Sequence, residues 1–423
     1  MSPQSGEAAH ARNVSFWYAR PCMLLVFYVL VIQQVLQGLY SLWQGIAWLG
    51  YVRRRLSTHA GFYTPQVALI CPCKGSEPGL ESSLMSLTKF EYSNYEIFFT
   101  LATSLDPAIK AIERVKATSP RKIHIVIVGP PEDSGEKVSN LRKAVEKLDE
   151  SFNVIVFVDS DVTLSRAWLT KLISPLGDAR VGAATTYRWL IPTRWPNKQD
   201  FASALGSAWN ASVATMLGDH GHNFCWGGGT AIRRGTFNDI NALEFWQGAV
   251  SDDLALTNAL ENQNKQILFV PECMAPTLYG ATFAELLEFT NRQIILTRVY
   301  SPRMWAAGFL SHASYVITSI VALFVVFSEM ITGDPWGQLL LLALAIPLLA
   351  TMKGALRTIA IGELLPEWKT KMRDWSWVWT ALAPIVPFLF FWNFCVSLVS
   401  KTIRWRGIRY RLVSANQTQI LKR

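Results

Sequence analysis

The sequence predicts an α/β fold, a doubly wound and mostly parallel sheet of the Rossmann type, joined to transmembrane helices. Residues 60–280 alternate short runs of β-branched residues with helix-like segments, an order typical of parallel sheets. Half of the 423 residues are hydrophobic and 17 are tryptophan, which is high for a soluble protein. Long stretches without a charged residue flank residues 60–280, and their lengths suit a bilayer. These three observations favour an α/β domain attached to a membrane.

The first uncharged stretch follows an N-terminal tail of residues 1–21. No charged residue occurs between Arg20 and Arg53, so we expect a transmembrane helix over residues 22–52. A cleaved signal peptide is the alternative, but its apolar core would be shorter and would end at small residues. The stretch instead runs into three consecutive arginines, which are typical of a cytoplasmic flank. The sequence therefore predicts that the next domain faces the cytoplasm.

The α/β domain is expected to span residues 60–280. Runs rich in β-branched and aromatic residues predict four strands, at 66–70, 95–101, 123–128 and 153–158. The helices that alternate with them are expected at 79–87, 107–117, 137–148 and 165–173. A domain of this size can bury a hydrophobic core of its own.

Residues 281–303 predict an amphipathic helix, because charged residues such as Glu285, Glu288 and Arg292 interrupt its apolar positions. Such a helix lies at the membrane interface or packs against the α/β domain. Residues 304–400 are then expected to form about three spans or re-entrant segments. They contain uncharged windows at 304–328, 335–352 and 375–400.

Basic residues constrain the topology of this second half. The C-terminal tail, residues 401–423, is basic, and so is the segment before the last window. Both are typical of the cytoplasmic side, whereas a single span between them would separate them. Either the last window is a re-entrant hairpin, bent at Pro384 and Pro387, or the tail departs from the positive-inside rule. The basic residues before the last window are Lys353, Arg357, Lys369, Lys371 and Arg373.

The net charge of +9 has two interpretations. It is typical of proteins that bind nucleic acid, and also of membrane proteins whose basic flanks face anionic lipid. Here the basic residues lie beside apolar spans, so we expect the bilayer as a partner and no nucleic acid.

Asp159 and Asp161 directly follow the fourth predicted strand. Ligands of α/β sheets bind beyond the carboxyl ends of the strands. Two carboxylates one residue apart can share a hard divalent cation, which also binds phosphate oxygens. The pair therefore predicts a metal-assisted site for a diphosphate-bearing substrate, while a solvated turn is the alternative.

Two further groups carry possible donor chemistry. Asp106 follows the second predicted strand, where it can bind a base or ribose, or cap the helix that begins after Pro107. Lys137 and Asn140 follow Gly135 near a helix start, where they can meet phosphate or form a solvated first turn.

A glycine run and a second aspartate pair complete the candidates. Residues 225–230 read Cys-Trp-Gly-Gly-Gly-Thr, which allows close approach of backbone to a ligand or simply a flexible loop. Asp252 and Asp253 stand at a predicted helix start, where one carboxylate can act as a cap. Adjacent carboxylates repel, which raises one pKa toward the range of a general base.

Taken in order, these features resemble the GT-A domain of lipid-directed glycosyltransferases, and most of all the ceramide glucosyltransferases of family 21. The motifs that carry the resemblance are Cys73-Lys74-Gly75, Asp106-Pro107-Ala108, residues 137–141, Asp159-Ser160-Asp161, Asp253, and the tail around Trp405-Arg406-Gly407. The resemblance covers about residues 20–413.

The resemblance implies a role for each candidate. The UDP-sugar donor would be bound by Lys74, Asp106, Lys137, Asn140 and Asp159. Asp159 and Asp161 would hold Mg²⁺ or Mn²⁺, and Asp253, with Asp252 beside it, would act as the base. An acceptor pocket would include Cys225, Trp226, Gly228, Gly229, Thr230, Arg292 and Arg298.

The chain departs from the family pattern at one motif. The family ends its catalytic domain with Gln or Arg, two residues, and then Arg-Trp. Arg292 fits the first position, but Ile295 and Leu296 stand in place of Arg-Trp. Arg298, one turn along the helix, is a candidate to supply the missing positive charge.

The implied activity is inverting transfer of a hexose, glucose in the first instance, from a UDP-sugar to ceramide in a multi-pass membrane protein. A hopanoid, a diacylglycerol or a polyprenyl phosphate is an alternative acceptor. A processive polysaccharide synthase normally needs the Arg-Trp motif and more spans. A catalytically silent membrane scaffold or lipid-binding protein is the alternative of another class.

Overall fold

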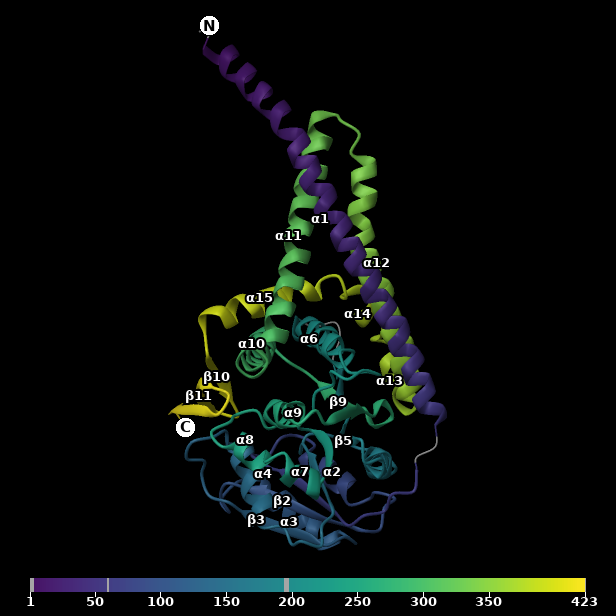
Figure 1. The fold of residues 1–423 in the computed structure, drawn as a ribbon, viewed down its shortest axis with the longest axis vertical. Coiled ribbons are helices and arrows are strands. Elements are labelled where there is room, and N and C mark those ends of the chain that lie inside the picture. Colours follow the sequence, from purple (N-terminus) through teal and green to yellow (C-terminus); the bar gives the residue numbers. More distant parts are fainter. Residues whose placement is uncertain (1–3, 59–60, 194–197, 423) are drawn as a thin grey trace.

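Three long helices project from one side of an α/β domain (Figure 1). The computed structural model describes residues 4–58, 61–193 and 198–422. In this part of the chain, three helices are long and apolar enough to cross a membrane. They are α1 (Gln4–Ser57), which qualifies from Arg20 onward, α11 (Pro302–Thr332) and α12 (Gly337–Leu364).

The α/β domain is built on a seven-stranded sheet in the order β3-β2-β1-β4-β7-β5-β8. Strands β1 to β4 pair in parallel, while β7 runs antiparallel to both of its neighbours. The predicted α/β class and mostly parallel sheet are therefore confirmed. The strands are β1 (Val67–Pro72), β2 (Tyr95–Leu101), β3 (Ile123–Ile127), β4 (Val154–Val158), β5 (Val181–Thr185), β7 (Gly229–Arg233) and β8 (Gln266–Phe269).

Helices cover both faces of this sheet, as a doubly wound fold requires. Along β1, Val67 and Leu69 face a core shared with α2 and α3, whereas Ala68 and Ile70 face a core shared with α4 and α9. Alternation of this kind makes a centrally placed strand apolar throughout. The helices are α2 (Leu80–Leu87), α3 (Ala108–Thr118), α4 (Glu136–Glu146), α5 (Trp168–Ile173), α7 (Arg234–Asp239), α8 (Ala242–Trp246) and α9 (Asp252–Asn262).

The strand order reverses beside β1. The chain moves from β1 outward to β2 and β3, and then returns to place β4 on the other side of β1. A crevice forms at such a reversal, outside the carboxyl ends of the two strands. The topology therefore brings the residues after β1 and after β4 together.

A smaller layer lies between the sheet and the long helices. It contains α6 (Lys198–Ala214) and the parallel pair β6 (Arg188–Pro192) and β9 (Ala275–Tyr279). Trp48, Trp209 and Trp379 share one buried cluster there, which joins the long helices to the α/β domain.

Residues 281–303 form α10 (Phe283–Tyr300), which begins with a capping box between Thr282 and Glu285. The helix packs against the α/β domain, where Ile295 and Leu296 are buried in its core, while Leu286 and Ile294 belong to the cluster that also contains residues of α1 and α12. Its position at a membrane interface stays a prediction.

The last uncharged window folds as two short helices, α14 (Ser376–Ala381) and α15 (Val386–Val399), with Pro384 between them. Neither has the length needed to cross a bilayer. In Figure 1, α15 runs across the base of α11 instead of beside it. The segment before them contains η3 (Pro366–Trp368) and α13 (Lys369–Arg373). It lies at the end of α12 that is next to the α/β domain.

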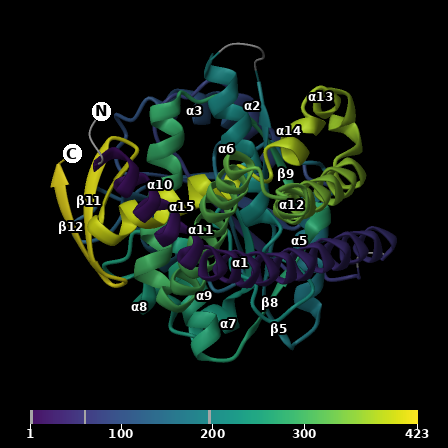
Figure 2. The same cartoon turned by 90° about the horizontal axis from the view of Figure 1, so that it is seen from above.

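The tail is a three-stranded antiparallel sheet on the flank of the α/β domain, opposite α13 when seen from above (Figure 2). The hydroxyl of Thr418 donates to the carbonyl of Gly248 at 2.7 Å, and the hydroxyl of Tyr410 accepts from the N–H of Glu136 at 3.3 Å. Both basic segments therefore lie on the side of the α/β domain. The strands are β10 (Thr402–Trp405), β11 (Ile408–Ser414) and β12 (Gln417–Lys422).

Close packing of α12 against α14 generates a stability prediction. A Cβ on Gly354 would lie 2.3 Å from the carbonyl oxygen of Trp379 and 2.9 Å from the Cα of Thr380. Since these are backbone atoms, Gly354→Ala should destabilise the protein by about 1–3 kcal/mol. The midpoint of thermal unfolding, followed by tryptophan fluorescence, should fall. Gly362→Ala on the same helix meets no atom within 4 Å and serves as the control; equal midpoints would contradict the packing argument.

Candidate active site

A cavity of about 750 Å³ lies at the carboxyl ends of β1 and β4 and continues between the long helices. The α/β domain lines one end, and one face each of α1, α11 and α12 lines the other. The structure brings nine of the residues predicted from sequence to this lining: Lys74, Lys137, Asn140, Asp159, Asp161, Trp226, Asp252, Asp253 and Arg292.

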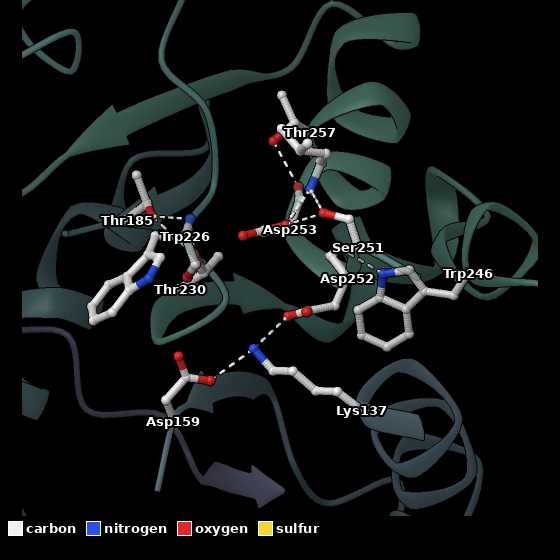
Figure 3. A network of polar contacts seen from close by, with 11 residues as sticks. Lys137, Asp159, Thr185, Trp226, Thr230, Trp246, Ser251, Asp252, Asp253 and Thr257 are labelled. Atoms are coloured by element: carbon white, nitrogen blue, oxygen red, sulfur yellow. Dashed lines mark hydrogen bonds and ion pairs between the residues drawn. The ribbon is translucent and has the colours of Figure 1, made fainter. Parts of the chain in front are cut away.

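Lys137 lies at the centre of the domain end (Figure 3). Its Nζ is 2.7 Å from Oδ1 of Asp159 and 3.2 Å from Oδ2 of Asp252. Burial alone would lower the pKa of Lys137, but the two carboxylates outweigh it and raise that pKa. Burial would likewise raise the pKa of Asp159, while Lys137 and Arg188 lower it. Lys137 and Asp159 therefore carry opposite charges at neutral pH.

The neighbouring aspartates of α9 point in different directions (Figure 3). Asp252 is 4% exposed and faces Lys137, and burial is the main cause that raises its pKa to about 7. Repulsion from Asp253, the expected cause, is a smaller contribution. Asp253 is partly exposed to the cavity, and its Oδ1 accepts hydrogen bonds from the hydroxyl of Ser251 and the N–H of Leu254.

Backbone contacts hold this pair in place. The indole N–H of Trp246 donates to the carbonyl of Asp252 at 2.9 Å, and the hydroxyl of Thr257 donates to the carbonyl of Asp253 at 2.7 Å. These contacts fix the backbone of the first turn of α9, from which both carboxylates project.

Most residues of the glycine run, residues 225–230, hold Trp226 in position and do not line the cavity. Trp226 and Gly227 line the cavity, whereas Cys225, Gly228, Gly229 and Thr230 lie behind them. The hydroxyl of Thr230 donates to the carbonyl of Trp226 at 2.8 Å. A Cβ on Gly228 would lie 2.2 Å from the Trp226 ring, so only glycine allows the ring to fold back there. Burial raises the pKa of the Cys225 thiol, which keeps it neutral.

Gly227 belongs to the glycine run predicted from sequence but was not assigned to the acceptor pocket, and it lies directly against the charged centre. A Cβ at this position would lie 2.3 Å from Oδ2 of Asp252 and 2.6 Å from Nζ of Lys137. The absence of a side chain therefore leaves the space that the Lys137–Asp252 ion pair fills.

At the domain end of the cavity, three guanidinium groups converge from different elements. Arg188, at the start of β6, lies 3.7 Å from Asp161 and 5.9 Å from the ring centre of Trp226. Arg292 of α10 lies over the ring of Trp405 at 5.6 Å, and burial lowers its pKa to about 10, so it stays charged. Arg406 comes from the tail.

The tail reaches the cavity through a tight turn. Arg406 and Gly407 both adopt positive φ, 48° and 82°, as a two-residue hairpin turn requires. The turn places Arg406 in an ion pair with Glu77, which follows β1, while Trp405 and Tyr410 also line the cavity. Sequence reasoning linked Trp405 and Arg406 to the family tail without assigning them to the site.

Two further predicted site residues, Asp106 and Arg298, lie outside the cavity lining. Oδ1 of Asp106 accepts from the N–H of Gly75 at 2.8 Å and of Ala108 at 2.9 Å, so it fixes the loop after β1 and caps α3. Arg298 donates to the carbonyls of Ser397 and Leu398 at the end of α15. Its charge therefore stabilises a helix C-terminus and is not directed at the cavity, contrary to the role considered for it.

The substituted motif is largely a packing feature here. Ile295 and Leu296 are 3% and 5% exposed, and Leu296 alone of the two lines the cavity. The cavity still contains the two kinds of group that the missing Arg-Trp pair would supply. Arg292 and Arg406 provide positive charge, and Trp405 provides an indole ring.

The carboxylates after β4 have the donor set for a divalent cation. Oδ1 of Asp161 is buried without a hydrogen-bond partner, as is Oδ1 of Asn140. Across residues 4–58, 61–193 and 198–422, no cluster of three or more His, Cys, Asp or Glu side chains could hold a metal by itself. Mg²⁺ is commonly held by one or two carboxylates together with substrate phosphates, so Asp159 and Asp161 fit it.

An α/β domain that presents paired carboxylates among cations at its strand ends suits chemistry on a phosphate-bearing substrate, and the three long apolar helices of the described residues suit a membrane. The chain belongs to glycosyl transferase family 21, whose model matches residues 13–418, so it is a glycosyltransferase. No curated protein matches the sequence.

Several solved structures are similar to this chain at low sequence identity. Mannosyltransferase PcManGT from Pyrobaculum calidifontis, solved with GDP-Man and Mn²⁺, has a TM-score of 0.44 at 14% identity, over 86% of this chain and 99% of its own. GalNAc-T7, solved with UDP, GalNAc and Mn²⁺, has a TM-score of 0.37 at 14% identity, over 52% of this chain and 44% of its own. Glucosyl-3-phosphoglycerate synthase from Mycobacterium tuberculosis, solved with phosphoglyceric acid, has a TM-score of 0.32 at 15% identity, over 59% of this chain and 82% of its own.

The raised pKa of Asp252 predicts a pH-dependent stability. Its ordinary value is 3.8 and its value in the folded protein is about 7. Between these values the folded state binds more protons than the unfolded state, so the free energy of unfolding falls as pH rises. Asp252→Asn lacks this titration. The unfolding midpoint of the variant minus that of the wild type should therefore increase from about pH 5 to about pH 8; a constant difference would contradict the prediction.

Proposed function

We propose that the protein transfers a hexose from a nucleotide-sugar donor to the hydroxyl group of a membrane lipid. The observation that carries this proposal is the continuity of the cavity. The same cavity is lined by Asp159 and Asp253 at one end and by α1, α11 and α12 at the other. A polar donor and an apolar acceptor can therefore occupy it together.

The donor diphosphate is assigned to the domain end. Lys74, Lys137, Arg188 and Arg292 supply positive charge there, and guanidinium groups suit phosphate oxygens. Asp159 and Asp161 would hold Mg²⁺ or Mn²⁺, and a bound cation offsets the negative charge that develops on the departing diphosphate. Asp106 would act on the uridine part, directly or through the loop that it fixes.

Asp253 is assigned as the general base. Its carboxylate takes the proton of the acceptor hydroxyl, and the acceptor oxygen then forms a bond to the anomeric carbon. The bond from that carbon to the diphosphate oxygen breaks in the same step, and the nucleoside diphosphate leaves. One displacement inverts the anomeric centre, so an α-linked donor gives a β-glycoside.

The substrates are proposed from the family resemblance. It makes UDP-glucose and ceramide the first pair to test, with hopanoid, diacylglycerol and polyprenyl phosphate as further acceptors. The catalytic domain is assigned to the cytoplasm because the arginines near the end of α1 and the basic tail both lie at the end of the long helices that is next to this domain.

The test of this activity is transfer of radiolabelled sugar from a panel of UDP-sugars, with each lipid offered separately. Membranes that contain the protein should yield one glycolipid, and EDTA should abolish it. Absence of product with every lipid, from folded protein, would overturn the proposal in favour of a silent membrane protein.

Asp253→Asn tests the assignment of the base. Loss of the proton acceptor should lower kcat by about 10²- to 10⁴-fold, with little change in donor affinity. Donor affinity is measured by calorimetry with UDP and Mn²⁺. The control is Asp239→Asn, an exposed residue of α7 outside the cavity lining, which should retain full activity. An Asp253→Asn enzyme with wild-type turnover would refute the assignment.

A further inference from the structure

The membrane end of the cavity contains two cations that the proposed chemistry does not use. Lys353 and Arg357 lie one turn apart on α12, on the face that also presents Ile346 and Leu349 to the cavity. The sequence places both in a basic segment beside a membrane span. The structure instead places them inside α12 and on the cavity wall.

Within the described part of the chain, both side chains form hydrogen bonds to uncharged groups only. Nζ of Lys353 donates to the hydroxyl of Ser41 on α1 at 2.7 Å. One terminal nitrogen of Arg357 donates to the hydroxyl of Ser212 on α6 at 3.0 Å. Arg357 is 8% exposed, and its Nε is buried without a hydrogen-bond partner. No acidic side chain of residues 4–58, 61–193 or 198–422 forms an ion pair with either residue.

Two like charges on one helical turn, withdrawn from water without a counter-charge, are costly for a folded protein. An anion in the cavity would remove that cost and satisfy the free donors of the guanidinium. Phosphate and carboxylate have the oxygen geometry that guanidinium groups bind best. The two residues therefore suit an anionic ligand.

The surroundings indicate that this anion belongs to a lipid. Gly354, between the two cations, packs against α14, so they lie where the short helices cross the base of the long ones. The cavity beside them is lined by apolar side chains, among them Ile346, Leu349 and Phe390. A head group at this level leaves its chains beside apolar residues, whereas a free phosphate would gain nothing from them.

A polar stripe on α1 faces the same space. Gln34, Gln37 and Ser41 line the cavity at helical spacing. Nε2 of Gln37 donates to the hydroxyl of Ser311 at 2.5 Å, so this stripe also joins α1 to α11. The membrane end of the cavity thus offers hydrogen-bonding groups around a cationic centre, within apolar walls.

We propose that Lys353 and Arg357 bind the anionic head group, a phosphate or carboxylate, of a membrane lipid held in the cavity. The identification of this lipid as the sugar acceptor rests on the proposed function. The binding of an anionic lipid at Lys353 and Arg357 does not depend on that function. Ceramide, hopanoid and diacylglycerol lack such a charge, so the site favours an acceptor that carries one.

Native mass spectrometry of the full-length protein in neutral detergent tests this assignment. The probes are phosphatidic acid and diacylglycerol with the same acyl chains. Wild-type protein should bind phosphatidic acid at least about tenfold more tightly than diacylglycerol, because hydrogen bonds between charged groups are involved. Lys353→Gln and Arg357→Gln should each weaken phosphatidic acid binding about tenfold and leave diacylglycerol binding unchanged.

Matched controls separate this site from surface charge. Lys371→Gln and Arg373→Gln remove exposed cations of α13 and should bind phosphatidic acid as the wild type does. Phosphatidic acid should also raise the unfolding midpoint of wild-type protein but not of Lys353→Gln/Arg357→Gln. This second measurement detects a variant that fails to fold.

Two results would overturn the proposal. One is equal binding of phosphatidic acid by wild-type protein and the double variant. The other is stabilisation by inorganic phosphate alone to the same extent, which would identify a free anion as the ligand. Sugar transfer to a neutral lipid, without phosphatidic acid binding, would remove this inference and leave the proposed function intact. Phosphatidic acid binding without transfer to any lipid would support the site and remove the proposed function.

Discussion

The Lys137 ammonium, placed between Asp159 and Asp252, is the interaction on which the site depends. Two buried carboxylates repel strongly at short range, and the ammonium between them offsets that repulsion. Loss of one member of a buried ion pair costs about 3–5 kcal/mol, because it leaves an uncompensated charge. The contact also joins the end of β4, the first turn of α4 and the start of α9. Gly227 is part of this arrangement, since any side chain there would occupy the space of the ion pair.

Much of the fold could be predicted because its signals are local. The apolar run of β4 and the alternation of strands with helices define the parallel half of the sheet without reference to distant residues. The antiparallel insertion of β7 was beyond such reasoning, and for residues 375–400 the sequence left a bend at Pro384 and Pro387 as one of two alternatives. An apolar window long enough to span became two short helices, because α10 and α12 offer them buried surfaces to pack against. The sequence pattern of residues 375–400 contains no information about packing surfaces that other segments provide.

The candidate site divides in the same way. Asp159 and Asp161 directly follow β4, and Asp253 lies in the first turn of α9, so residue type and position within these elements were enough to single them out. Arg188 and Arg406 reach the cavity from β6 and from the tail, and no local pattern separates them from surface arginines. Lys353 and Arg357 were interpreted as topology signals, since the positive-inside rule counts charges without regard to which face of a helix carries them.

The tail strands lie far from the paired aspartates in sequence, yet Trp405, Arg406 and Tyr410 help to enclose the same cavity. These residues follow all three long helices along the chain. During synthesis the α/β core can therefore fold first, but the cavity is closed only after the three long helices and the chain beyond them have been made. The order of the elements thus makes completion of the site one of the last steps in folding.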